Sequence, residues 1–331
     1  MTVLVDDRLR LLAAALLLTG IPDREQGQYA HKVHPLADVA AAELDSLRAH
    51  PAVRMIEAAA DQQPFLIIVP HVLRLSLPDL HPRTGVVVEP WEEIPLLTGE
   101  DFLQSFRDFR DEVERRGLWR TTAPAWQTLV DDLSSVLAER DMAGFLALFW
   151  GETGRPFVVL PNPLAPRLER IGLYAPEANY AVLPPPAIPP DSSEPPTYAS
   201  RSAATRYVAC HELSHGAEFR ARKRTPGLEP AIAEVMSRTP AGERFRTSYP
   251  GDVWPFSEIL LRAVQVLYAR HHEDTETAAL FLGRHRGQEG LETLAEWAGR
   301  LEPYLEGRRA GRYRGWDEYL PNFLTALRTA S

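Results

Sequence analysis

The sequence contains very little cysteine and no apolar run long enough to cross a membrane. Cys210 is the single cysteine among 331 residues, so no disulfide can form within the chain. Such usage is typical of proteins from a reducing compartment. Residues 8–20 contain two arginines followed by an apolar run, which is too short to span a bilayer. Asp6 and Asp7 stand where a signal peptide would carry basic residues. The sequence therefore predicts a cytoplasmic protein, with residues 8–20 in a buried helix capped by Asp6 or Asp7.

Positive charge is also in short supply. The chain carries 36 lysines and arginines against 45 aspartates and glutamates, a net charge of −9. An excess of negative charge argues against nucleic acid or an anionic membrane as the main partner. Two basic runs, 220–224 and 308–314, are interpreted as solvated helix ends, where cations complement the helix dipole.

The first 150 residues are predicted to form a helical lobe. Apolar residues recur at helical spacing in residues 34–50 and 51–62, which a His-Pro step separates. Residues 100–117 place their apolar side chains on one stripe, and further helices are expected between 122 and 150. This lobe shows no concentrated set of catalytic residues. Four histidines are interpreted as surface or core side chains: His31, His34, His71 and His81.

A second lobe, 151–331, is predicted to begin where the composition changes. Two strands are expected between about 155 and 183, the second at 178–183 and paired with the first. The prolines of 184–196 exclude a helix interior or a central strand, so a stiff connector or an exposed loop is expected there. Helices are then predicted over about 198–219, over about 255–271 and towards the C-terminus. The fold class is therefore α+β, mainly α.

The helix predicted after the proline-rich segment contains His211-Glu212-Leu213-Ser214-His215. Residues four apart lie on one face of a helix, so His211 and His215 can direct both imidazoles at one metal ion. Zinc held by two histidines needs a third protein ligand and an open position. Zinc then lowers the pKa of a water molecule towards about 7, and a nearby carboxylate takes a proton from that water as it attacks a carbonyl. Glu212, turned by about 100° from His211, is predicted to be this general base.

The third zinc ligand is expected from a later helix. A further histidine six residues after His215 is ruled out, because Ala221 stands there. Glu258 is the best candidate, since it lies near the start of an apolar helix over 254–272. A carboxylate in such a helix needs a partner, because burying it unpaired is costly.

Other carboxylates are interpreted differently. Glu218 lies on the same helix as the two histidines and is better placed to contact a ligand side chain than to bind the metal itself. Glu229 and Glu234 fall in or after a Pro-Gly loop and are expected to face solvent. Cys210 points to another side of the helix from the two histidines and is interpreted as a small buried residue.

The motif at 211–215, followed by a helix with Glu258, resembles the gluzincin metallopeptidases, the thermolysin-like group. The chain also resembles a family of uncharacterised bacterial gluzincin-like proteins, through an N-terminal helix, a segment like 50–53 and the sequence Glu258-x-x-x-Arg262-Ala263. This resemblance implies a zincin-like catalytic core with a small sheet. It also implies that the edge strand of the sheet, 178–183, binds an extended peptide beside the metal by β-augmentation.

A tyrosine that stabilises the oxyanion is a second implication of the resemblance. Tyr249 lies shortly upstream of Glu258, much as a tyrosine does in the thermolysin-like enzymes, and Tyr319 is the second candidate. The rivals are Tyr268, His271, His272 and Tyr313.

One position departs from the thermolysin-like pattern. That group has an aspartate four residues after the ligand glutamate, where it orients a zinc-bound histidine, and this chain has Arg262. The orienting role must then fall to another residue, with Glu218 and Asp252 as candidates. Arg262 either pairs with a carboxylate of the site or of the substrate, or forms a structural salt bridge.

Together these features predict a zinc metallopeptidase acting on a peptide or protein. Zn²⁺ would be bound by His211, His215 and Glu258, with Glu212 as general base. A scaffold or binding protein that kept a zincin fold and grips a partner peptide is the alternative. A third hypothesis is a helical interaction protein without metal, in which the motif is accidental.

Overall fold

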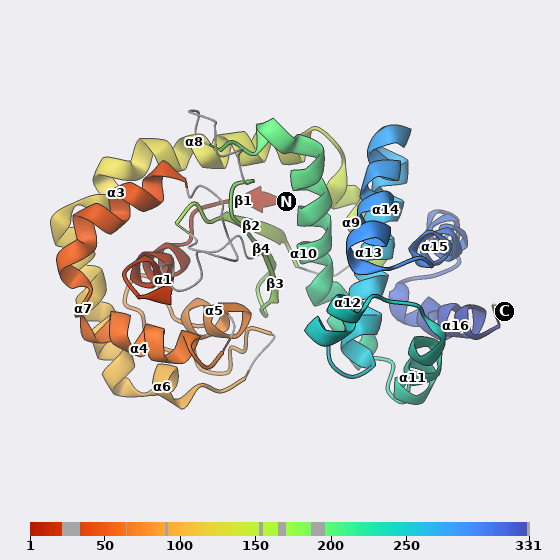
Figure 1. Cartoon of the computed structure of the whole chain (residues 1–331), viewed down its shortest axis with the longest axis horizontal. Coiled ribbons are helices and arrows are strands. Elements are labelled where there is room, and N and C mark those ends of the chain that lie inside the picture. The colour runs from red at the N-terminus through yellow and green to blue at the C-terminus, as the bar shows by residue number, and fades with distance from the viewer. Residues whose placement is uncertain are drawn as a thin grey trace. The chain divides into compact units, whose positions relative to one another are not determined.

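The computed structural model describes residues 1–21, 34–63, 65–89, 92–151, 155–164, 170–186 and 196–329. Most of the predicted proline-rich connector and His31 lie outside these ranges. The chain divides into two compact units, the first made of Met1–Val136 and Phe157–Thr205 and the second of Leu137–Pro156 and Arg206–Ser331. The fold is α+β and mainly helical, as predicted (Figure 1). Within the described ranges, no helix combines the length and the apolarity that a membrane span requires.

The helices of the first unit begin at residues that cap them. Asp6 accepts hydrogen bonds from the main-chain nitrogens of Arg8 and Leu9, which confirms the predicted start of α1. His34 and His50 cap α3 and α4 in the same way, each followed by proline at the first helical position. In the described ranges, the helices of this unit are α1 (Asp7–Leu17), α3 (Pro35–Leu44), the 3₁₀ helix η1 (Asp45–Leu47), α4 (Pro51–Ala60), α5 (Phe65–Leu73), α6 (Pro95–Thr98), α7 (Glu100–Arg116), most of α8 (Leu118–Ala138), the 3₁₀ helix η2 (Ala199–Arg201) and the first residues of α10 (Ser202–Lys223).

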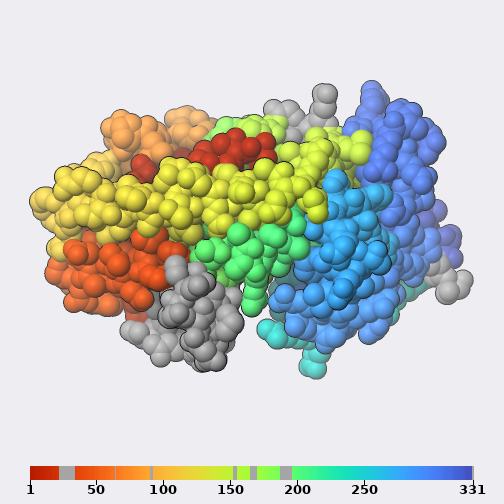
Figure 2. Space-filling model, turned by 90° about the horizontal axis from the view of Figure 1, so that it is seen from above, coloured from red at the N-terminus to blue at the C-terminus, as the bar shows by residue number. Residues whose placement is uncertain are grey.

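Helix α8 has one buried stripe and one exposed face. Trp126, Leu129, Leu133 and Val136 are buried at spacings of three and four residues, as an amphipathic helix requires. The opposite side of α8, in yellow, forms part of the molecular surface (Figure 2).

The described strands form one four-stranded sheet in the first unit. Its members are β1 (Thr2–Val3), β2 (Phe157–Pro161), β3 (Ile171–Tyr174) and β4 (Asn179–Leu183), in the order β1-β2-β4-β3. The predicted pairing of β4 with β2 is confirmed and is parallel. However, β4 also pairs with β3 in antiparallel orientation, so its main-chain groups are used on both sides. The prediction that residues 178–183 form an edge strand open to a peptide is therefore wrong.

The sheet also changes the expected division of the chain at residue 150. Thr2 of β1 lies opposite Val158 of β2, which ties residues 157–161 to the N-terminus. The Tyr198 hydroxyl donates to the main-chain oxygen of Leu183, 2.7 Å away. The strands therefore belong with the first unit, whereas the zinc-motif helix continues into the second.

Helix α13 is the central helix of the second unit. Every residue from Pro255 to Ala269 is buried, and α13 contacts α11, α14 and α15. Four of these buried residues are polar or charged and need partners: Ser257, Glu258, Arg262 and Gln265. The helices of this unit are α9 (Met142–Trp150), most of α10, α11 (Glu229–Arg238), α12 (Glu243–Ser248), α13 (Val253–His272), α14 (Thr275–Glu289), α15 (Leu294–Arg309) and α16 (Trp316–Arg328).

Candidate metal centre

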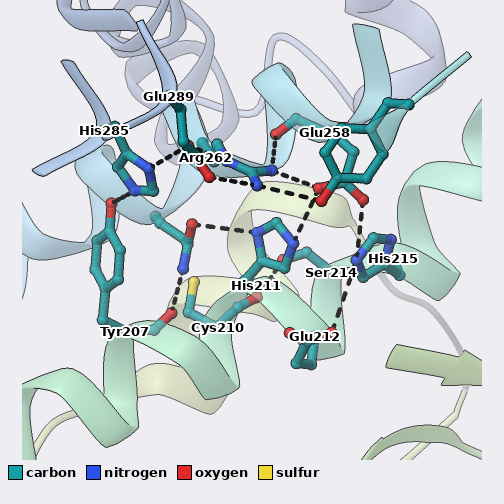
Figure 3. A network of polar contacts seen from close by, with 12 residues as sticks. Tyr207, Cys210, His211, Glu212, Ser214, His215, Glu258, Arg262, His285 and Glu289 are labelled. Atoms are coloured by element: carbon teal, nitrogen blue, oxygen red, sulfur yellow. Dashed lines mark hydrogen bonds and ion pairs between the residues drawn. The ribbon is translucent and has the colours of Figure 1, made fainter. Parts of the chain in front are cut away.

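The structure brings the three predicted zinc ligands together within the second unit (Figure 3). His211 and His215 extend from α10 and Glu258 from α13, and their potential ligand atoms all lie within 4.8 Å of one another. His211 Nε2 is 3.5 Å from Glu258 Oε2, and His215 Nε2 is 3.7 Å from Glu258 Oε1. Two imidazole nitrogens and a carboxylate are a donor set that zinc prefers. The cluster therefore fits one zinc ion.

The protonation of these side chains suits a metal centre. Burial lowers the pKa of His215 to about 4, so its imidazole is neutral near pH 7 and keeps a lone pair for a metal. Burial acts to raise the pKa of Glu258, but its neighbours His211, His215 and Arg262 lower it overall. Glu258 is therefore ionised.

Glu212 lies beside the ligand group. Its Oε2 is 3.7 Å from His215 Nε2, and only 8% of the residue is exposed. His215 is the most open of the neighbours, with 29% of its side chain exposed. The ligand group is therefore most exposed to solvent at His215.

Gln265 orients His211, a role that the sequence did not reveal. Its Nε2 donates to the main-chain oxygen of Tyr207 at 2.8 Å, and its Oε1 lies 3.1 Å from His211 Nδ1. Because that amide oxygen can only accept, His211 must carry its proton on Nδ1, and Nε2 is left to bind a metal. The available signal was position, since Gln265 lies seven residues after Glu258 on the same helix face.

The two residues expected to take this orienting role lie elsewhere. Glu218 accepts hydrogen bonds from Ser257 and from Arg222, at 3.0 and 3.1 Å. Asp252 is exposed at the N-terminus of α13. Both predictions are wrong, because His211 Nδ1 faces Gln265 of α13. It does not face Glu218 or Asp252.

Arg262 pairs with a carboxylate of the site, which was one of its two predicted roles. It hydrogen-bonds to Glu258 and forms an ion pair with Glu289 of α14. Its Nη2 also lies 3.4 Å from the Tyr249 hydroxyl oxygen. Burial raises the pKa of Tyr249, so its hydroxyl stays protonated and can donate.

Tyr319 is not brought to the ligand group. Its hydroxyl donates to the main-chain oxygen of Arg300 at 3.3 Å, and its ring stacks on Tyr304 at 4.9 Å between centroids. Among the rivals, Tyr268 stacks on His272, and His271 pairs with Glu302. Tyr249 is thus the candidate donor that the structure connects to the ligands, through Arg262.

Cys210 is confirmed as a small buried residue of α10. It has no exposed surface, and burial raises the pKa of its thiol. A protonated thiol is a poor metal ligand. Glu229 is exposed, and Glu234 pairs with Arg238 and Arg328 at the surface.

Acid is expected to destabilise the metal-free protein in a defined pH range. Burial lowers the pKa of His71 and of His215 from 6.5 to about 4. Between these pH values the unfolded chain binds protons that the folded chain does not, so the free energy of unfolding falls as the pH falls from 6.5 to 4. Burial acts to raise the pKa of Glu289, but His285 and Arg262 lower it from 4.5 to about 2. A further loss is therefore expected between pH 4.5 and 2.

Urea titrations of the metal-free protein at several pH values measure this loss. The midpoint should fall from pH 7 to 5 and again from pH 5 to 3. A midpoint that stayed constant from pH 7 to 5 would contradict the assignment of the histidines as neutral in the folded state.

No protein-family model, no curated protein and no solved structure matches this chain. The resemblance to the gluzincins accordingly depends on the motif at 211–215, on Glu258 and on the geometry described above.

Proposed function

We propose that this chain is a zinc-dependent hydrolase of the gluzincin type that cleaves peptide bonds. The observation that carries the proposal is the convergence of His211, His215 and Glu258 from two helices, with the carboxylate of Glu212 next to them. A zincin-like catalytic core and a peptide or protein substrate belong to the proposal, on the strength of the resemblance.

Each side chain then has a defined task. Bound zinc would polarise the carbonyl of the scissile bond and lower the pKa of a water molecule. Glu212 takes a proton as the water oxygen bonds to the carbonyl carbon, and it returns that proton to the amine nitrogen when the carbon–nitrogen bond breaks. Tyr249 donates its hydroxyl proton in a hydrogen bond to the developing oxyanion.

The alternative, a zincin-fold protein that grips a partner peptide, shares the metal site and differs in chemistry. In such a protein Glu212 would be dispensable and a bound peptide would stay intact. A protein without metal would differ from both in metal content.

Metal analysis of the parent chain beside His215→Ala tests the proposal. We expect about one zinc per parent chain, because the donor set matches zinc's preference, and a loss of most of this zinc in the variant. His271→Ala, whose histidine pairs with Glu302 outside the ligand group, is the matched control and should keep its zinc.

The same samples are incubated with a mixture of unstructured peptides, and new termini are identified by mass spectrometry. New termini made by the parent and not by His215→Ala support the hydrolase. Zinc without cleavage would favour the binding protein, and no zinc even after reloading would make the motif accidental.

A further inference from the structure

Arg262 contacts three side chains at once: a predicted metal ligand, a predicted proton donor and a second glutamate (Figure 3). It is 7% exposed. Its Nη1 hydrogen-bonds to Oε2 of Glu258 and also donates to the main-chain oxygen of the same residue, 3.1 Å away. One oxygen of the metal-binding carboxylate is therefore already held by a cation of the protein.

A second carboxylate clamps this guanidinium. Glu289 accepts from Arg262 Nε at 2.7 Å and from Nη2 at 2.9 Å, a two-bond arrangement that fixes the plane of the group. Glu289 also accepts from His285 Nδ1 at 2.7 Å, and His285 Nε2 lies 2.9 Å from the hydroxyl of Tyr207. Because Nδ1 carries the imidazole proton, Nε2 accepts from Tyr207, so the chain of bonds leads back to α10.

This clamp leaves Glu258 one oxygen without a contact to Arg262. Oε1 is 3.7 Å from His215 Nε2, whereas Oε2 is bound by the guanidinium. Arginine keeps its charge at all ordinary pH values and has no acceptor, so it cannot become a ligand or release Oε2 by deprotonation. Two-oxygen binding of a metal by Glu258 would make Oε2, which lies 3.5 Å from His211 Nε2, share its lone pairs between the metal and Arg262.

We propose that Arg262 is a positioning residue that makes Glu258 a one-oxygen ligand, binding the metal through Oε1. This inference rests on the zinc centre of the proposed function. In the thermolysin-like pattern an aspartate orients a histidine ligand. Here an arginine would orient the carboxylate ligand instead. The same guanidinium donates to the oxygen of Tyr249, which leaves the hydroxyl proton of that tyrosine available for a substrate.

Stability alone is a weak reason for such a buried pair. Desolvating two charges costs about as much as their attraction returns, and replacing a buried ion pair by apolar residues is often neutral or stabilising. Arg262 and Glu258 are both less than 10% exposed. The Arg262 guanidinium donates four hydrogen bonds to two glutamates, Glu258 and Glu289. Because these bonds add little net stability, their main effect is to orient the Glu258 carboxylate.

The test is the zinc dissociation constant, measured by competition with a chelator. Removing a partner that orients a metal ligand typically weakens binding by about 10–100-fold, and we expect a loss in this range for Arg262→Met. Arg262→Lys keeps the charge but not the planar fork, so its loss should be smaller. The melting temperature of each metal-free variant is measured beside the affinity, so that loss of folding is recognised.

Arg222→Met is the matched control. Arg222 also pairs with a buried glutamate four residues away, Glu218, at 3.1 Å, and that glutamate is not one of the clustered ligands. Its replacement should alter stability and leave zinc affinity as in the parent. A purely structural role for Arg262 predicts the same result for Arg262→Met.

Unchanged zinc affinity in folded Arg262→Met would overturn this inference and leave the proposed function standing. Absence of zinc from the parent would overturn both. If Arg262→Met does not fold, Glu289→Gln is the second test of the inference. In that variant Arg262 still contacts Glu258, but the two-bond clamp that Glu289 places on Arg262 is weakened. We expect zinc binding several-fold weaker than in the parent, and parent affinity in Glu289→Gln would overturn the inference.

Discussion

Replacing Glu212 by glutamine is expected to abolish hydrolysis while zinc stays bound. Glutamine has nearly the same shape but cannot take a proton from water, and general-base catalysis contributes about 10²–10⁴-fold to such rates. Glu212 lies beside the three clustered ligands, its Oε2 3.7 Å from His215 Nε2. The cleavage rate of a peptide substrate and the zinc content are measured on the same sample of Glu212→Gln.

Glu218→Gln is the control for this experiment. Glu218 is the other buried carboxylate of α10, and its partners Ser257 and Arg222 lie outside the ligand group. Its variant should cleave peptide within a few-fold of the parent rate. Parent-like turnover in Glu212→Gln would remove Glu212 from the mechanism, and loss of zinc in that variant would make Glu212 a ligand.

Glu258→Ala is expected to lose zinc under mild chelation. Two histidines remain, and the loss should exceed the roughly 10–100-fold that removal of an orienting partner causes. The variant should still fold, because Arg262 keeps its two bonds to Glu289 and is not left as an unpaired buried charge. Zinc retained after dialysis against a chelator is measured by elemental analysis, and folding by circular dichroism.

A glutamate with surface partners provides the comparison. Glu234 pairs with Arg238 and Arg328, so Glu234→Ala should keep its zinc through the same dialysis. If Glu258→Ala bound zinc as tightly as the parent, the third ligand would be another residue. The inference about Arg262 would then lose its basis, although a zinc centre would remain.

The elements that sequence reasoning predicted correctly are those set by neighbours along the chain. The cap of α1 by Asp6 follows from hydrogen bonds to nitrogens two and three residues away. The common face of His211 and His215 follows from the helical repeat alone. Glu258 was predicted because a carboxylate in an apolar helix needs a partner, and burial there is confirmed at 4% exposure.

Errors arose where a residue's partner lies far along the chain. The position of β4 inside the sheet depends on pairing with both β2 and β3, and the periodicity of one strand contains no information about its neighbours. Strands β2, β3 and β4 belong to the first unit because β2 pairs with β1, a strand of only two residues at the N-terminus. Tyr319 packs against the aromatic rings of Tyr304 and Trp316 and does not contact the ligands.

By itself the sequence determined which residues can bind a metal: two histidines one helical turn apart, a glutamate between them and a later glutamate in an apolar helix. Only the tertiary structure decided which residues contact and orient these ligands. Gln265 faces His211, and Arg262 holds Glu258 under the clamp of Glu289. The physical reason is that a motif records spacing within one helix, whereas a buried polar group takes the partner that packing brings to it.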